Sequence, residues 1–187
     1  MPIKLTTPLT KDKLASLRAG DEVLLTGTIY TARDAAHRRI AELLLRAEEP
    51  PFELRDAAVY YAGPTPARPG EVCGSFGPTT SSRMDAYTPA LLERGMSAMI
   101  GKGERAQAVV ESIAKHGAVY FGAIGGIAAL GAKCVAAKET IAFHDLDSEA
   151  VCRVEVRDMP LTVLVDSRGG NYYRLGAENY LKSKGKK

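Results

Sequence analysis

The sequence predicts an α/β domain with a mixed sheet, and three observations carry that prediction. In the first two thirds, short β-branched and aliphatic runs alternate with segments whose apolar residues recur at helical spacing. Turns rich in Gly and Pro separate these segments. The last third instead alternates apolar and polar residues, which is typical of antiparallel strands. Strands that alternate with helices and are followed by extra strands indicate a layered α/β architecture.

Length and composition favour one globular domain that spans residues 1–187. The chain is 45% hydrophobic and 25% charged, and 187 residues are enough to bury a substantial core. The longest apolar segment, near residues 120–130, is interrupted by glycines and is too short to cross a bilayer. The first residues also lack the apolar core of a signal peptide. We therefore expect a cytoplasmic protein with no membrane partner.

Charge and cysteine usage exclude two further classes of protein. The net charge is only +3, and the one dense basic run, residues 182–187, is expected to be a disordered tail rather than a nucleic-acid arm. Cys73, Cys134 and Cys152 are far apart and form no C-x-x-C motif. The chain alone is therefore expected to bind neither nucleic acid nor a metal.

The individual elements follow from periodicity and turn signals. Strands are expected at residues 21–30, 57–61, 97–100 and 119–122. Helices are expected at residues 32–47, 84–95 and 104–117, with a small-residue helix within 122–133. Thr31 and Asp34 resemble a capping box at the start of the first helix. Residues 150–173 are expected to form antiparallel strands or a hairpin, with a turn at Arg-Gly-Gly-Asn.

The segment GPTTSSRMD, residues 77–85, joins a predicted strand to a predicted helix. It combines a Gly-Pro turn, four consecutive hydroxyl residues and Arg83. Hydroxyls at a helix start can simply cap backbone N–H groups. They can equally cradle an anion, with Thr79 or Thr80 donating hydrogen bonds and Arg83 gripping a carboxylate.

Two other strand-to-helix junctions carry positive charge. Arg33 and His37 share the helical stripe that later turns to the core, although Arg33 could pair with Asp34 or Glu22 and His37 could be an ordinary interface histidine. Lys102 lies between two glycines before the third helix, where a plain surface turn is the alternative. An α/β sheet gathers such junctions at its carboxyl edge. The implied ligand is an anion with more than one acidic group.

Four segments in consistent order give the chain a family resemblance. They are TARDAAHRR at 31–39, GPTTSSRMD at 77–85, MIGKG at 99–103 and DLDSEAVCRVEVRDMPLTVLVDSRGGN at 145–171. Together they resemble the β subunit of two-subunit class I fumarases and of L(+)-tartrate dehydratases. The same region forms the C-terminal domain of single-chain class I fumarases. The resemblance spans nearly the whole chain.

The resemblance implies a fold, a reaction and a partner. The fold would be a layered, swivelling β/β/α domain, and the reaction would be the reversible addition of water to a dicarboxylate double bond. A [4Fe-4S] cluster would lie on a companion α subunit, where iron acts as a Lewis acid toward the departing hydroxyl. This chain would bind no cofactor alone, and the assembly would be α2β2.

The resemblance also implies residue roles. Thr79 and Arg83 would be catalytic, with Thr79 as the base that removes a proton beside a carboxylate. Arg33, Arg83 and Lys102 would hold the two carboxylates and stabilise the charge that develops as the proton leaves. His37, on the same helix face as Arg33, and Thr80, from the hydroxyl-rich junction, are further candidates for substrate binding. A threonine hydroxyl is a poor base in water, so it would need activation by its surroundings.

One departure and two alternatives accompany this interpretation. Asp147 stands where the family has glycine in a DLG stretch, which is expected to perturb a loop. Fumarate and L(+)-tartrate differ by hydroxyl groups, and no residue in the sequence distinguishes them. A stand-alone anion-binding or regulatory module would use the same three junctions without chemistry.

Overall fold

The structure is a computed structural model that describes residues 1–123 and 128–184, with the side chains of 177–179 and 182–184 left out. Its sheet has seven strands in the order β1-β2-β3-β4-β5-β7-β6. The strands are β1 Ile3–Thr6, β2 Glu22–Thr31, β3 Ala58–Tyr60, β4 Ala98–Gly101, β5 Val119–Gly122, β6 Val135–Ala142 and β7 Val151–Val165. Strands β1 to β5 pair in parallel, and β7 runs antiparallel to its neighbours. The predicted mixed α/β class is confirmed.

The long strand β7 closes the central strands into a ring. It pairs with β6 and β5, and it also pairs with β2 over most of the length of β2. Because β2 continues through β3 and β4 to β5, the pairings return to their starting strand. A closed circuit of this kind leaves the inside of the strands enclosed.

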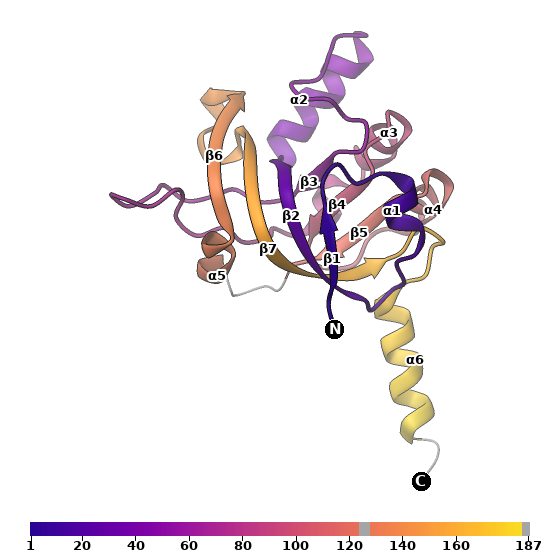
Figure 1. The fold of residues 1–187 in the computed structure, drawn as a ribbon. Helices are drawn as coiled ribbons and strands as arrows, with labels where there is room; N and C mark the ends of the chain where they lie inside the picture. The colour runs from indigo at the N-terminus through magenta and orange to yellow at the C-terminus, as the bar shows by residue number, and fades with distance from the viewer. Residues whose placement is uncertain (124–127, 185–187) are drawn as a thin grey trace.

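The helices are α1 Lys11–Ala15, α2 Asp34–Leu45, α3 Thr88–Glu93, α4 Gln107–His116, α5 Ala128–Lys133 and α6 Tyr172–Lys184, with 3₁₀ turns η1 Ser81–Met84 and η2 His144–Glu149. Helices α2, α3 and α4 cover one side of β3, β4 and β5. Figure 1 shows α3 and α4 at one end of the molecule and β6 with α5 at the other. Successive side chains of a strand point to opposite faces of the sheet, so alternate residues of β3 pack in two different apolar clusters.

Two buried apolar clusters define the layers. The inner cluster lies among the strands and α1, and includes Leu14, Tyr60 and Val156. The helix-side cluster lies between the sheet and α2, α3 and α4, and includes Ile40 and Tyr61. Strand, strand and helix layers thus follow one another across the molecule.

Most predicted elements are confirmed, with two exceptions. Of the two alternatives for residues 150–173, the antiparallel strand is confirmed and the hairpin is wrong: residues 151–165 are one strand with a bulge near Asp158 (φ 45°), and the Arg-Gly-Gly-Asn turn leads into α6. The partner that completes a hairpin with it is β6, which the sequence did not predict. The Thr31–Asp34 capping box is also wrong: Arg33 is the N-cap of α2 without a side-chain cap, and the Thr31 hydroxyl bonds to the backbone of β7.

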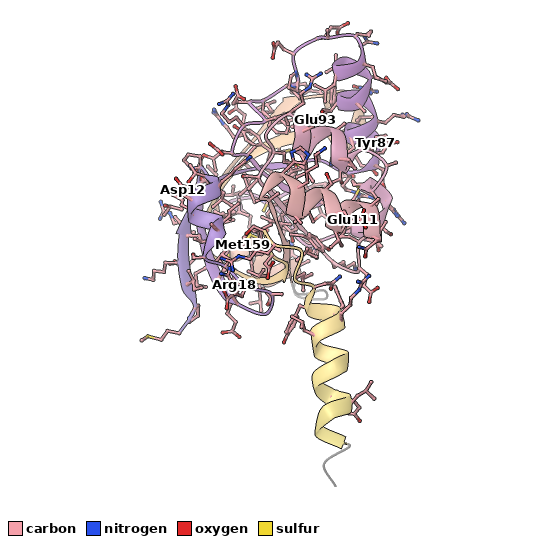
Figure 2. The ribbon with its side chains drawn as sticks, turned by 90° about the vertical axis from the view of Figure 1, so that its right-hand side faces the viewer. Asp12, Arg18, Tyr87, Glu93, Glu111 and Met159 are labelled. Atoms are coloured by element: carbon pink, nitrogen blue, oxygen red, sulfur yellow. The ribbon has the colours of Figure 1, made fainter. Side chains whose placement is uncertain are left out.

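The C-terminal part of the chain follows a turn held by Asp166. Its carboxylate accepts hydrogen bonds from the Arg168 and Gly170 N–H groups, which confirms the predicted turn. Helix α6 then projects from the body that carries Tyr87, Glu93 and Glu111 (Figure 2). The expected disordered tail begins at residue 182, whereas α6 runs to Lys184, and residues 185–187 lie outside the described residues.

Two remaining expectations concern the glycine-rich segment and the membrane. Part of the small-residue helix expected within 122–133 is α5, whereas residues 124–127 lie outside the described residues. In the described part of the chain, no helix is both long and apolar enough to span a bilayer.

Candidate anion-binding site

The carboxyl ends of β2, β3 and β4 lie at one edge of the sheet because these strands are parallel. Arg33 follows the end of β2, and Lys102 follows the end of β4. The segment from Thr79 joins them: the Thr79 N–H donates to the Tyr61 carbonyl at 2.7 Å, just beyond β3. The three junctions singled out in the sequence therefore meet at one edge.

Thr80 and Lys102 are neighbours through a short stretch of parallel bridge pairing. The Ser81 N–H donates to the Lys102 carbonyl at 3.0 Å, and the Lys102 N–H donates to the Ser81 hydroxyl, also at 3.0 Å. The Thr80 and Lys102 side chains remain exposed, and Thr79 is half-buried. A Cβ at position 101 would overlap the Ser81 hydroxyl, so glycine is what allows this close approach.

Arg33 and Arg83 are linked through a shared carboxylate. Asp34 lies 3.9 Å from Arg33 and 3.7 Å from Arg83, and Glu149 of η2 lies 3.1 Å from Arg33. The pairing of Arg33 with Asp34 was one of the alternatives open from the sequence, but its closer partner is Glu149. Both arginine side chains keep exposed surface, 23% for Arg33 and 57% for Arg83. Both guanidinium groups thus remain available to an anion.

His37 is fully buried in the first turns of α2. Its Nδ1 lies 3.0 Å from the Arg33 carbonyl, which can only accept, so Nδ1 carries the proton and Nε2 is an acceptor. Burial lowers the pKa of His37 to about 4, so the ring is neutral at physiological pH. The ring packs edge-on against Tyr61, with centroids 5.2 Å apart.

Two buried polar atoms at this edge have no partner among the described residues. They are Arg33 Nε, a donor, and His37 Nε2, an acceptor. Buried polar groups in folded proteins are nearly always hydrogen-bonded, and an exception calls for an explanation. A bound ligand or ordered water would satisfy both atoms.

A buried polar network beneath the edge was missed from the sequence. Its centre is Arg105, whose side chain has no exposed surface. Arg105 Nε donates to Asp85 at 2.6 Å, and another guanidinium nitrogen donates to the Thr88 hydroxyl at 2.7 Å. Burial lowers the pKa of Arg105, but Tyr61 and Asp85 more than offset it, so the pKa is raised. The available sequence signal was that Asp85 and Arg105, which carry opposite charges, each lie at or just after the end of a glycine-containing junction.

Metal ligands do not gather anywhere in residues 1–123 and 128–184: no group of three or more His, Cys, Asp or Glu side chains could hold a metal ion. Burial raises the pKa of the Cys73 and Cys134 thiols, which disfavours the thiolate form that a cluster needs. The described residues therefore do not fit an iron-sulfur cluster held by this chain alone.

One partly open pocket of the described residues lies away from this edge. It has a volume of about 460 Å³ and lies between the loop after β3 and α5, where Cys73, Lys133 and Val135 line it. None of the six predicted site residues lines it. We place the candidate site at the sheet edge because the cations and the two unpartnered atoms lie there, and because an edge open to solvent needs no closed cavity.

Comparisons with known proteins agree with the resemblance. The family described as Fumarase C-terminus matches residues 1–176. "Fumarate hydratase 2" of Leishmania major is 39% identical over 175 residues, which are 91% of this chain and 31% of that protein. "Fumarate hydratase class I, anaerobic" of Escherichia coli (strain K12) is 39% identical over 164 residues, 87% of this chain and 30% of that protein.

A different relative has the same size as this chain. A candidate L(+)-tartrate dehydratase subunit beta of Methanocaldococcus jannaschii is 40% identical over 171 residues, which are 88% of each protein. The chain therefore spans about a third of the two fumarate hydratases and most of the β subunit.

Proposed function

Because the chain belongs to the Fumarase C-terminus family, we propose that it is the dicarboxylate-binding β subunit of a hydro-lyase that reversibly hydrates fumarate to malate. The observation that carries the proposal is the meeting of three junctions at one sheet edge, with Arg33 Nε and His37 Nε2 buried there without partners among the described residues. A dicarboxylate supplies acceptors for the first, and a hydroxyl or water supplies a donor for the second.

The cations would hold the two carboxylates. Arg33 and Arg83 flank Asp34, so one substrate carboxylate would compete with Asp34 for their guanidinium groups. Lys102, whose side chain is exposed beside Thr80, would bind the other carboxylate as a point charge. These cations would also stabilise the negative charge that develops on a carboxylate when the neighbouring carbon loses its proton.

Thr79 would transfer the proton at the carbon beside a carboxylate. Its backbone is fixed by the 2.7 Å hydrogen bond to Tyr61, and its side chain is half-buried. Proximity of Arg83 and Lys102 on the same segment and turn would favour the ionised hydroxyl that a base requires. In the hydration direction, the same hydroxyl would return the proton.

A companion chain would complete the enzyme. We propose that a cluster-bearing α subunit assembles with this chain as α2β2 in the cytoplasm, since the described residues offer no ligand set for a cluster. That cluster, when bound, would supply Lewis-acid chemistry toward the hydroxyl. The relative named as a β subunit supports a two-subunit organisation.

L(+)-tartrate is the second candidate substrate, and one observation favours it. The tartrate dehydratase β subunit matches this chain over 88% of both lengths, whereas the fumarate hydratases are about three times longer. A stand-alone anion-binding module is the third candidate, and it would bind a dicarboxylate tightly with no companion.

An anaerobic assay tests these proposals. The chain is assayed alone and after co-production with a cluster-bearing companion, on fumarate, malate and L(+)-tartrate in parallel. We expect turnover only in the complex, with the preferred substrate deciding between the first two candidates. Turnover by the isolated, iron-free chain would overturn the shared site. Tight dicarboxylate binding by the chain alone, with no turnover in a stable complex with an intact cluster, would support the binding module.

A further inference from the structure

We infer that Arg105 is a positioning residue: from beneath the sheet edge, it fixes the turn that carries Lys102 against the segment that carries Thr79 and Arg83. This inference rests on the proposed function for its kinetic consequences. Its structural part rests only on contacts among described residues.

Arg105 holds the segment 79–88 from one side. Asp85 accepts its Nε–H, and Thr88 accepts a second guanidinium N–H. Thr88 in turn donates to the Met84 carbonyl at 2.8 Å, at the end of η1. The guanidinium therefore anchors η1, the 3₁₀ turn that includes Arg83 and lies just after Thr79.

The same guanidinium holds the start of α4. One oxygen of Asp85 accepts from Arg105, and the other accepts the Ala106 N–H at 2.8 Å. Asp85 therefore contacts both Arg105 and the residue that follows it, at the start of α4. The carboxylate thus bridges two elements that are 20 residues apart. Residues 102–104 lie between β4 and this anchor, so the Lys102 turn is fixed at both ends.

Two tyrosines extend the contact to the Lys102 turn itself. The guanidinium carbon lies 5.3 Å from the Tyr61 ring and 5.0 Å from the Tyr120 ring, both within cation–π range. The Tyr120 hydroxyl lies 2.8 Å from the Ser81 hydroxyl and 2.9 Å from the Gly103 carbonyl. One phenolic proton serves only one acceptor at a time, so all contacts are satisfied when Tyr120 donates to Gly103 and accepts from Ser81.

Ser81 links the contacts of Tyr120 and Arg105 to the backbone of Lys102. The Ser81 hydroxyl accepts the Lys102 N–H, and the Ser81 N–H donates to the Lys102 carbonyl. Tyr120 and Arg105 therefore support the two hydrogen bonds that hold Lys102 beside Thr80. Displacing the guanidinium would loosen this junction without touching a substrate-binding side chain.

Arg105→Lys tests the inference because it keeps the charge and loses the planar set of donors. The first measurement is amide hydrogen exchange on the full chain. We expect exchange at the Ser81 and Lys102 amides to accelerate at least about tenfold, with the β7 amides unchanged. Unchanged exchange at both amides in the folded variant would overturn the inference. Asp85→Asn provides a second variant if Arg105→Lys does not fold.

The second measurement is steady-state kinetics of the assembled complex. A merely structural role lowers the amount of active enzyme and so lowers apparent kcat while leaving KM unchanged. A displaced Lys102 instead weakens substrate binding, and we expect Arg105→Lys to raise KM about five- to tenfold. The matched control is Leu14→Ala, which removes buried packing in the inner cluster and should leave KM unchanged.

A double variant separates this inference from the proposed function. In a Lys102→Ala background, Arg105→Lys should raise KM much less than in the wild type, because a large part of its effect acts through Lys102. A full additional rise in that background would contradict the inference. If Lys102→Ala itself leaves KM unchanged, the proposed site is wrong, whereas the hydrogen-exchange result still decides whether Arg105 positions the turn.

Discussion

Arg33 and Arg105 lie at the same edge of the sheet but in opposite circumstances. Arg105 has no exposed side-chain surface and donates to Asp85 and Thr88 at short distances. Arg33 keeps 23% of its side chain exposed, and its buried Nε has no partner among the described residues. A guanidinium that is satisfied from within stabilises the fold, whereas one that keeps a spare donor at an open edge is suited to a ligand.

Arg83→Ala should show the largest effect on activity and almost none on stability. Arg83, like Arg33, is partly open to solvent, with 57% of its side chain exposed and a long 3.7 Å contact to Asp34. Loss of a bidentate grip on a developing charge is expected to lower kcat/KM of the complex about 10³-fold. The free energy of unfolding should change by no more than about 0.5 kcal/mol. Turnover within a few-fold of the wild type would remove Arg83 from the site.

Thr79→Ala is the companion experiment. It removes only the hydroxyl and a methyl group, so the 2.7 Å backbone bond to Tyr61 remains. Turnover of the complex should fall steeply, because the variant lacks the hydroxyl that is proposed to transfer the proton. Thr79→Ser retains a hydroxyl and is the matched control, expected to keep most of the activity. Equal activity in all three proteins would show that Thr79 transfers no proton.

Arg105→Met should have the opposite effect to Arg83→Ala: it should mainly lower the free energy of unfolding. The change leaves the carboxylate of Asp85, only 15% exposed, without its cation. Breaking a buried pair on one side typically destabilises by about 3–5 kcal/mol. Urea denaturation should therefore show a large fall in the midpoint for Arg105→Met and a small one for Arg33→Met. Similar losses for both variants would contradict the contrast between the two arginines.

Burial of His37 at the same edge makes the free energy of unfolding depend on pH. Its folded pKa of about 4 lies below the unfolded value of 6.5, because burial disfavours the charged ring; the Arg33 carbonyl and Asp34 raise it, and Arg105 lowers it. Above pH 6.5 the group has no effect on stability. As pH falls from 6.5 toward 4, only the unfolded chain gains the proton, and stability falls by about 3 kcal/mol in total.

The measurement is the free energy of unfolding of wild type and His37→Gln between about pH 7 and about pH 4. The variant should lose less stability over that range, because glutamine does not titrate. Parallel curves for the two proteins would show that another group causes the acid sensitivity.

The partly or fully solvent-exposed residues at the sheet edge could be placed together from the sequence, whereas the buried contacts of Arg105 could not. Strand-to-helix junctions are local features, and parallel strands bring their ends to one edge, so periodicity and turn signals alone place Arg33, Thr79 and Lys102 together. Arg105 follows a glycine turn and precedes a helix, where an arginine is usually solvated. Its burial depends on Asp85 and Thr88, which are about 20 residues away and are brought in by tertiary packing.

The missed strands have similar physical causes. Strand β1 has only four residues, and β6 has mostly exposed or half-buried residues, so neither shows a clear apolar pattern. Both are held by neighbouring strands rather than by their own propensity. A hairpin is one expectation for residues 150–173 because they contain the Arg-Gly-Gly-Asn turn, but this turn lies between β7 and α6 rather than between two strands.

Asp147→Gly should change the free energy of unfolding only slightly. The substitution lies close to Glu149, the residue that pairs with Arg33. Asp147 has φ 48° and ψ −114°, a backbone conformation that glycine tolerates and other residues rarely adopt. The expectation that aspartate perturbs a loop that otherwise carries glycine is consistent with this geometry. Two residues later, Glu149 pairs with Arg33 at 3.1 Å and accepts the Ala35 N–H at 3.2 Å. Strain at Asp147 therefore lies next to the contact that orients Arg33.

Removing that strain should raise the free energy of unfolding by about 1 kcal/mol, less the entropy that glycine adds to the unfolded chain. Thermal unfolding of the full chain measures the change, and Asp147→Ala is the control, since it removes the carboxylate and keeps the strained Cβ. A stability of Asp147→Gly below that of Asp147→Ala by the full entropy cost of glycine would show that the backbone conformation stores no strain.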